Sequence, residues 1–334
     1  MKTSHIALFI VAVLIVAGVG AYIVTNQDGN TNDQGKKTIP DSDYYPVTIR
    51  TEVSGTVHEQ TFYEAPKRVV VFFNPNIEML CYFGLQDTIV AASGVSNNGK
   101  YNALFEEHQE VFDSIDRREN LMNVELVRSL DPDLIVAWAS TFTGRLGTVD
   151  MWNEYGTNCV VTNRPATSVE DYLAMLERIG TIFNMKDAAD AKIAEFTSAY
   201  TAIEDRTANL TDNQKVKALM LEPGYEDGCY AYGAKFLSGD LITKAGGINL
   251  YGGGMDRLTF EQIAAYDPDI IFIVPDYSSP TIASVAVSVE RFRAVPGFAS
   301  LTNNVVGFEF DELYMGGLFQ ADIIDKLFEL MYPD

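Results

Sequence analysis

The chain carries the stretch NVELVRSLDPDLIVA at residues 123–137 and repeats its pattern as TFEQIAAYDPDIIFI at residues 259–273. Each copy has an N-cap residue, a Glu two positions later, a short helix, Asp-Pro-Asp and an apolar strand. Asn123 and Thr259 are favourable N-cap residues, and the proline of each copy ends its helix. The apolar runs that follow are typical of strands buried on both faces of a parallel sheet. The repeat, with its copies about 136 residues apart (259 minus 123), predicts two similar α/β lobes rather than a short-period solenoid.

Length and composition describe a folded chain with an acidic surface. The 334 residues are enough for two domains. The net charge of -22 excludes a nucleic-acid partner, which would require a basic face. Cys81, Cys159 and Cys229 are far apart in the sequence and form no CxxC motif, so we expect no zinc or iron–sulfur site. We also expect no cofactor, no bound structural metal and no catalytic residues.

In the N-terminal segment, residues 1–26, Lys2 precedes an uncharged apolar run from Ile6 to Val24. It is about long enough to span a bilayer, and it is longer than the core of a typical signal peptide. We expect a retained anchor with the body of the protein on the extracellular face of the membrane; the alternative is a signal cleaved before Ala21. No Cys follows the run, which excludes a lipid anchor of the bacterial type. Residues 27–45 are polar and predict a flexible linker.

The rest of the chain alternates short strands and helices, which predicts mostly parallel sheets. Ser54-Gly55 lies between two alternating runs and predicts a β-hairpin. Ser168–Phe183 and about 187–208 have helical spacing, whereas Asn74–Asn76 and Glu222–Ala234 are expected to be loops. We therefore expect an N-terminal lobe over 46–167, a connecting helix over 168–186 and a C-terminal lobe over 187–334.

Read in order, these segments resemble the substrate-binding proteins of ABC importers for iron–siderophores, cobalamin and haem. The resemblance covers about residues 47–332 and has six parts. They are the hairpin leading into Ala65–Val71, Asn74–Leu80 running to Gly84-Leu85, both Asp-Pro-Asp repeats, Ile179-Gly180, Leu237 through Gly247, and Phe292–Phe298. The resemblance implies two Rossmann-like lobes joined by one long helix, with the ligand in the cleft between them. Because the chain has no P-loop motif, it also implies a separate permease dimer and ATPase.

The resemblance gives a role to the two repeated glutamates. In similar proteins one surface Glu of each lobe docks against arginines of the permease, and Glu125 and Glu261 match these positions. A two-fold symmetric permease can meet matched charges only if both lobes present them alike. The alternative is that each Glu only complements the dipole of its helix.

Ligands of open parallel sheets bind beyond the carboxyl ends of the strands. The loops expected there are rich in aromatic residues, which suit a large, partly apolar ligand such as a metal chelate or a corrinoid. A ferric siderophore ranks first, and cobalamin or haem next. The residues expected to line the site are Asn76, Tyr101, Trp138, Phe142, Arg145, Arg164, Tyr225, Tyr230, Tyr232, Tyr277 and Tyr314. Many of these aromatics could equally pack within their own lobe, and bare Fe(III) held by Tyr225 or Tyr230 with Glu222 or Glu226 stays an alternative.

Two other classes of function compete with transport. One is a two-lobed enzyme acting on metal chelates, in the manner of a chelatase, because fold does not fix function. Against it, none of His5, His58 and His108 is expected at a strand end, and no G-x-S-x-G motif is present. The other is a ligand sensor without transport. The sequence therefore favours a binding protein over an enzyme.

Overall fold

The structure is a computed structural model, and its described part excludes the N-terminal 42 residues and several internal segments. The described residues are 43–93, 114–116, 118, 120–162, 168–223, 227–275, 284–295, 304–309, 313, 317–318 and 320–333. The predicted anchor and most of the predicted linker therefore lie outside them. Within the described residues no helix is long and apolar enough to cross a bilayer.

The first elements form the predicted hairpin. β1 (Val47–Val53) pairs antiparallel with β2 (Thr56–Phe62) in a continuous register. Both turn residues have positive φ, 52° at Ser54 and 82° at Gly55, the backbone that a two-residue hairpin requires.

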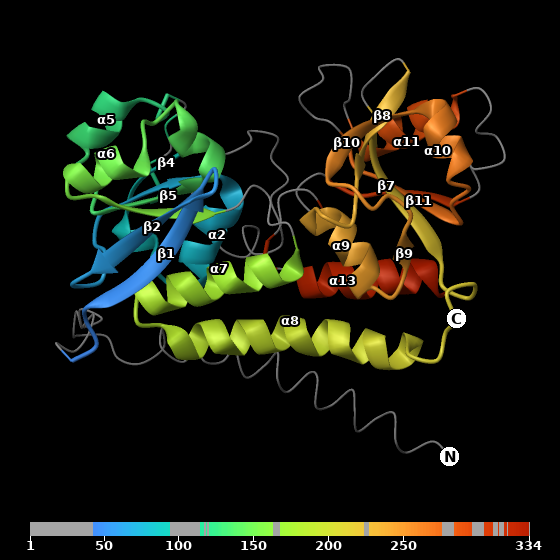
Figure 1. The fold of residues 1–334 in the computed structure, drawn as a ribbon, viewed down its shortest axis with the longest axis horizontal. Helices are drawn as coiled ribbons and strands as arrows, with labels where there is room; N and C mark the ends of the chain where they lie inside the picture. Colours follow the sequence, from blue (N-terminus) through green and yellow to red (C-terminus); the bar gives the residue numbers. More distant parts are fainter. Residues whose placement is uncertain are drawn as a thin grey trace. The chain divides into compact units, whose positions relative to one another are not determined.

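The first sheet has four parallel strands in the order β4-β3-β5-β6 (Figure 1). Short helices connect them, so each strand is followed by a crossover, as parallel pairing demands. The strands are β3 (Val69–Phe72), β4 (Ile89–Ser93), β5 (Leu134–Trp138) and β6 (Asn158–Thr162), and the helices are α2 (Asn74–Tyr82), η1 (Gln86–Thr88), α5 (Val124–Ser129), η2 (Ala139–Thr143) and α6 (Val149–Glu154). The expected loop Asn74–Asn76 is instead the first turn of α2, a position where proline is tolerated because the missing N–H has no helical partner.

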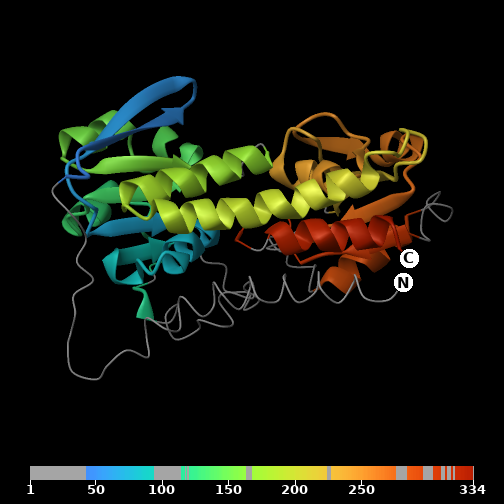
Figure 2. The same cartoon turned by 90° about the horizontal axis from the view of Figure 1, so that it is seen from below.

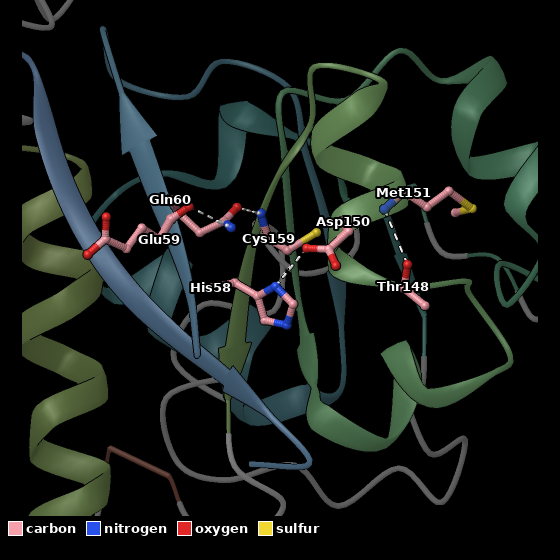
Figure 3. Close-up of polar contacts among 7 residues, drawn as sticks. All are labelled: His58, Glu59, Gln60, Thr148, Asp150, Met151 and Cys159. Atoms are coloured by element: carbon pink, nitrogen blue, oxygen red, sulfur yellow. Dashed lines mark hydrogen bonds and ion pairs between the residues drawn. The ribbon is translucent and has the colours of Figure 1, made fainter. Parts of the chain in front are cut away.

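Side chains of the hairpin bind the outer edge of β6 (Figure 3). The Gln60 side-chain oxygen accepts from the Cys159 N–H at 2.8 Å. The Thr51 hydroxyl accepts from the Val161 N–H at 2.8 Å. Nearby, His58 Nδ1 lies 2.8 Å from the Asp150 carboxylate at the start of α6. The hairpin is thus joined to the sheet by side chains rather than by a backbone ladder.

Two helices follow the first sheet. α7 (Val169–Ile182) begins at the Ser168 N-cap, whose hydroxyl accepts from the Asp171 N–H at 3.2 Å. α8 (Lys186–Thr207) packs against α7 and also against α13 (Gln320–Met331), and Figures 1 and 2 show α7 and α13 along opposite halves of α8. Both helices were expected from the sequence, the first over Ser168–Phe183 and the second over about 187–208. α8 contacts α7 from the first half and α13 from the second.

The second sheet is mixed rather than mostly parallel. Its order is β10-β8-β7-β11-β12, and β9 pairs with the beginning of β7. β7, β9, β11 and β12 are parallel to one another, whereas β8 runs antiparallel to both of its neighbours, β7 and β10. The strands are β7 (Lys217–Pro223), β8 (Gly228–Tyr232), β9 (Ile248–Asn249), β10 (Met255–Thr259), β11 (Ile270–Ile273) and β12 (Val305–Gly307), and the helices are α9 (Leu237–Lys244), α10 (Phe260–Ala265) and α11 (Val285–Arg293). The loop expected over Glu222–Ala234 therefore contains a strand, because β8 finds partners in β7 and β10.

Both Asp-Pro-Asp motifs take the same backbone. Asp131 and Asp267 each have φ of 49°, a left-handed conformation that Asp tolerates better than most residues. The second aspartate of each motif then caps the neighbouring strand. The Asp133 carboxylate accepts from the N–H groups of Lys67 and Arg68 at 2.7 and 3.0 Å. The Asp269 carboxylate accepts from the Lys217 N–H at 2.8 Å.

Candidate functional site

An aromatic pair occupies the carboxyl ends of two central strands of the first sheet. Trp138 is the last residue of β5, and Phe73 directly follows β3. Their rings are parallel, with centroids 3.5 Å apart and an interplanar angle of 6°. Both side chains are half-buried, whereas every residue of β3 and the first four of β5 are buried. The pair therefore lies at the boundary between the buried part of the sheet and its partly exposed carboxyl edge.

The backbone of Phe73 has an unusual conformation for a residue with a side chain. Its φ is 73° and its ψ 139°, a region that favours glycine. Three backbone hydrogen bonds hold it. Its N–H donates to the Ser93 carbonyl at 2.7 Å, and its carbonyl accepts from the N–H groups of Asn76 and Ile77 at 3.1 and 3.2 Å. The start of α2 is thereby fixed against β4.

Three of the residues expected in the first lobe differ in their surroundings. Asn76 is buried, and its amide donates to the Phe72 carbonyl at 2.8 Å and to the Thr162 hydroxyl at 3.2 Å, so it joins the ends of β3 and β6. Phe142 is buried in the core beside β5. Arg145 is exposed in the turn after η2. Their ligand contacts stay predictions.

The second sheet places a carboxylate and a phenol at the end of β7. Glu222 and Tyr232 are both buried, and the Tyr232 hydroxyl donates to the Glu222 carboxylate. Tyr230 is half-buried on β8, opposite Glu222 in the β7–β8 register. Burial, together with the nearby Glu222 charge, raises the pKa of the Cys229 thiol to about 12, so this cysteine is a core residue. A ligand role for Tyr230 and Tyr232 stays a prediction.

Several expected site residues lie outside the described residues. These are Tyr101, Arg164, Tyr225, Tyr277 and Tyr314. Among the residues whose positions are described, no cluster of three or more His, Cys, Asp or Glu side chains could hold a metal ion.

The two repeated glutamates occupy the same helical position. Glu125 is the second residue of α5 and Glu261 the second residue of α10, and both are exposed. The Asn123 side chain accepts from the Leu126 N–H at 2.8 Å, and Thr259 forms a complete capping box with Gln262. Hydrogen bonds from its own backbone N–H and from the Thr259 hydroxyl lower the pKa of Glu261. Glu261 is therefore an exposed carboxylate that stays ionised at neutral pH.

The sequence did not indicate Phe73 as a site residue. It ends an apolar run and directly precedes Asn74-Pro75, so nothing in the pattern separates it from the buried Phe72 before it. The turn of the backbone at the end of β3 leaves its ring half-buried against the core of the first sheet.

Known proteins resemble this chain over most of its length. A family model described as periplasmic binding protein matches residues 69–302. A Bacillus subtilis protein named uncharacterized ABC transporter substrate-binding lipoprotein YvrC is 23% identical over 308 residues, which is 92% of each chain. A cobalamin-binding protein of Halobacterium salinarum is 28% identical over 269 residues, covering 78% of this chain and 68% of its own length.

A solved structure agrees with the fold. The crystal structure of a periplasmic binding protein from Veillonella parvula superposes with a TM-score of 0.75 at 25% identity, covering 86% of this chain and 92% of that one. Since the family model spans well over half of the sequence, the chain belongs to the periplasmic binding protein family.

Proposed function

We propose that this protein is the extracytoplasmic solute-binding component of an ABC importer. It captures a metal chelate between its two lobes and delivers the chelate to a permease dimer, which a separate ATPase drives. The observation that carries this proposal is the family match over residues 69–302. The Bacillus subtilis relative, an ABC transporter substrate-binding protein by name, supports it.

The ligand is a large chelate of the siderophore, cobalamin or haem type. The sequence alone ranks a ferric siderophore first. The cobalamin-binding relative of Halobacterium salinarum favours a corrinoid, and a stacked aromatic pair at the edge of the first sheet suits such a ring system. Both classes enter the binding test.

Glu125 and Glu261 are proposed to dock on the permease. Both are exposed, both lie in the first turn of a short helix, and both follow the same spacing from an Asp-Pro-Asp motif. Exposed charges of this kind set the register and the encounter rate of a complex more than its affinity. A favourable interaction with the helix dipole would explain each glutamate separately. It gives no reason why both lobes place a glutamate at the same position.

The N-terminal apolar run is proposed to hold the protein on the extracellular face of the membrane. The Bacillus subtilis relative is named a lipoprotein, and here the absence of a Cys after the run leaves the run itself as the anchor. Membranes washed at alkaline pH should retain the protein. Release of a soluble form that begins near Ala21 would support a cleaved signal instead.

The test of binding uses the two tryptophans. Trp152 is fully buried in the first lobe, whereas Trp138 is half-buried at the carboxyl edge of β5. In the Trp152→Phe variant the fluorescence comes from Trp138 alone, and in Trp138→Phe from Trp152 alone. Titration with cyanocobalamin, haem, a ferric catecholate, a ferric hydroxamate and free Fe(III) should change the emission of the first variant strongly and of the second weakly.

The same titration separates transport from the alternatives. Saturable binding without turnover of the chelate fits a binding protein, whereas release of metal or hydrolysis of the chelate would identify an enzyme. A sensor would bind its ligand, but cells lacking the protein would take up that ligand normally. Absence of binding to every member of the panel would contradict the proposed function.

A further inference from the structure

The conformation of Phe73 has no parallel among the other strained residues of the described chain. The non-glycine residues with positive φ are Ser54, Phe73, Asn184, Asp131 and Asp267. Ser, Asn and Asp are small and polar, and Asn and Asp visit this region readily. Phe73 is the large apolar exception, in a backbone region that is unfavourable for any side chain. A glycine would satisfy the backbone better, so the phenyl ring itself must be what the position retains.

Packing accounts for only part of the ring, because Phe73 contacts the core of the first sheet but stays half-buried. Phe72, one residue earlier, is fully buried, whereas Phe73 and its stacking partner Trp138 are both half-buried. Strained residues cluster at ligand-binding positions, where the surroundings hold them in place. Here the hydrogen bonds from Phe73 to Ser93, Asn76 and Ile77 provide that restraint.

The fold does not require an aromatic pair at these positions either. Val69 pairs with Leu134 in the first sheet, and Ala218 pairs with Ile270 in the second. Leu134 and Ile270 each directly follow an Asp-Pro-Asp motif, so the two pairs correspond. Counting four residues onward, Phe73 corresponds to Glu222 and Trp138 to Val274. The second sheet thus has neither ring at these positions, and Glu222 continues β7 as a strand residue where Phe73 turns into a helix.

We propose that Phe73 and Trp138 form one rigid aromatic platform that contacts the ligand through a flat conjugated face, and that the strained backbone of Phe73 positions it. This inference rests on the proposed function and specifies the chemistry of its site. Two parallel rings at the carboxyl edge of the sheet present a polarisable surface where ligands of open α/β sheets bind. A macrocycle or a catecholate ring has such a face, whereas a hydroxamate chelate does not.

Two substitutions distinguish the effect of the aromatic ring from the effect of the backbone strain at Phe73. Phe73→Leu keeps the apolar bulk and the strained backbone but removes the aromatic face. Phe73→Gly removes the ring and relieves the strain. Tyr155→Leu is the matched control, because Tyr155 is an exposed aromatic at the end of α6 that contacts Trp152 edge-on.

Binding is measured by calorimetry, which does not depend on tryptophan emission. Phe73→Leu should weaken binding of the flat-ring ligand about tenfold, consistent with the loss of one stacked ring, and Phe73→Gly should weaken it further. Tyr155→Leu should bind as the parent does. Cyanocobalamin, haem and the ferric catecholate distinguish the possible sources of the flat ring, and the ferric hydroxamate is the comparator without one.

Thermal unfolding shows whether Phe73 serves mainly to pack the fold, because the midpoints of the two variants then differ in a known order. Relief of strain should leave the midpoint of Phe73→Gly at or above that of Phe73→Leu, although more apolar surface is removed. A platform is contradicted if both variants bind the flat-ring ligand as tightly as the parent, or if the parent prefers the hydroxamate. It is also contradicted if the unfolding midpoint of Phe73→Gly lies well below that of Phe73→Leu. The apolar bulk at position 73 would then serve packing. If the parent binds no ligand at all, the proposed function itself fails, and the platform with it.

Discussion

The two copies of the repeated phrase are alike at one end of their strands and different at the other. At the amino ends, Asp133 and Asp269 cap the neighbouring strand, and Asp131 and Asp267 share a φ of 49°. At the carboxyl ends, the first copy leads to the stacked Phe73 and Trp138. The second leads to a buried Glu222 bound by Tyr232. The amino ends of the strands therefore share the same backbone and caps in both sheets, whereas the carboxyl ends carry different side chains.

The largest expected effect concerns Glu125 and Glu261, which occupy the same position in both copies. Reversing both charges, Glu125→Arg with Glu261→Arg, should reduce ligand uptake by cells to background, because in the proposed docking like charges would then face each other across the contact with the permease. Each single reversal should reduce uptake about tenfold or more, since about 1.4 kcal/mol of lost binding is tenfold. Ligand affinity of the purified variants should not change.

A matched control reverses two other exposed glutamates, Glu154→Arg with Glu329→Arg, which lie near the end of α6 and in α13. Uptake by this control should equal that of the parent. If the Glu125 and Glu261 variants also transport normally, the repeated glutamates serve only their helices.

The capping aspartates should differ in the energy that they contribute. The Asp133 carboxylate accepts two backbone N–H groups and is half-buried, whereas Asp269 accepts one and is exposed. Hydrogen bonds to a charged group contribute more than neutral ones. Asp133→Ala should therefore lower the free energy of unfolding by about 2 kcal/mol and Asp269→Ala by about 1 kcal/mol. Urea denaturation measures both, and equal losses would show that the two caps are energetically equivalent.

The helix caps provide a smaller test of the same frame. Thr259→Ala removes the capping box of α10 and should lower the free energy of unfolding by about 1 kcal/mol. Asn123→Ala removes a single side-chain bond at α5 and should have a smaller effect. A larger loss from Asn123→Ala would reverse this order and give the first copy the stronger cap.

The smallest expected effect is a change in titration at Glu261. Its pKa lies below the ordinary value because its carboxylate accepts from its own N–H and from the Thr259 hydroxyl. A carboxyl with a lowered pKa stabilises the fold above its unfolded-state pKa, and this stabilisation is lost as the pH falls through its folded-state pKa. NMR titration should show the pKa of Glu261 rising toward the ordinary value in Thr259→Ala. An unchanged value would contradict the assignment of this hydrogen bond.

Much of the frame was predictable from the sequence, because it depends on short-range signals. Ser54-Gly55 predicted the hairpin, and the two Asp-Pro-Asp motifs predicted the helix ends and the strands that follow them. Ser168 predicted the start of α7. In each case a turn residue, a cap or a continuous apolar run acts locally, so the neighbouring residues suffice.

Features set by distant partners were not predictable in the same way. Gly228–Tyr232 looks like a loop in sequence and becomes β8 only by pairing with β7 and β10. Asn76 and Tyr232 have buried polar partners that arrive from other strands, and the ligand contacts expected of them stay predictions. The exposure of Phe73 depends on a backbone turn that its residue type disfavours. These positions are decided by tertiary contacts, which no local pattern contains.

The contact between the hairpin and β6 has a consequence for how this protein behaves among copies of itself. The last strand of a sheet presents unpaired N–H groups that can recruit a strand from another chain, a common route to aggregation. Gln60 and Thr51 occupy the outward N–H groups of Cys159 and Val161. These two N–H groups of the β6 edge therefore have partners without the addition of a further strand. Apolar replacements at these two positions would reopen it to intermolecular β-pairing.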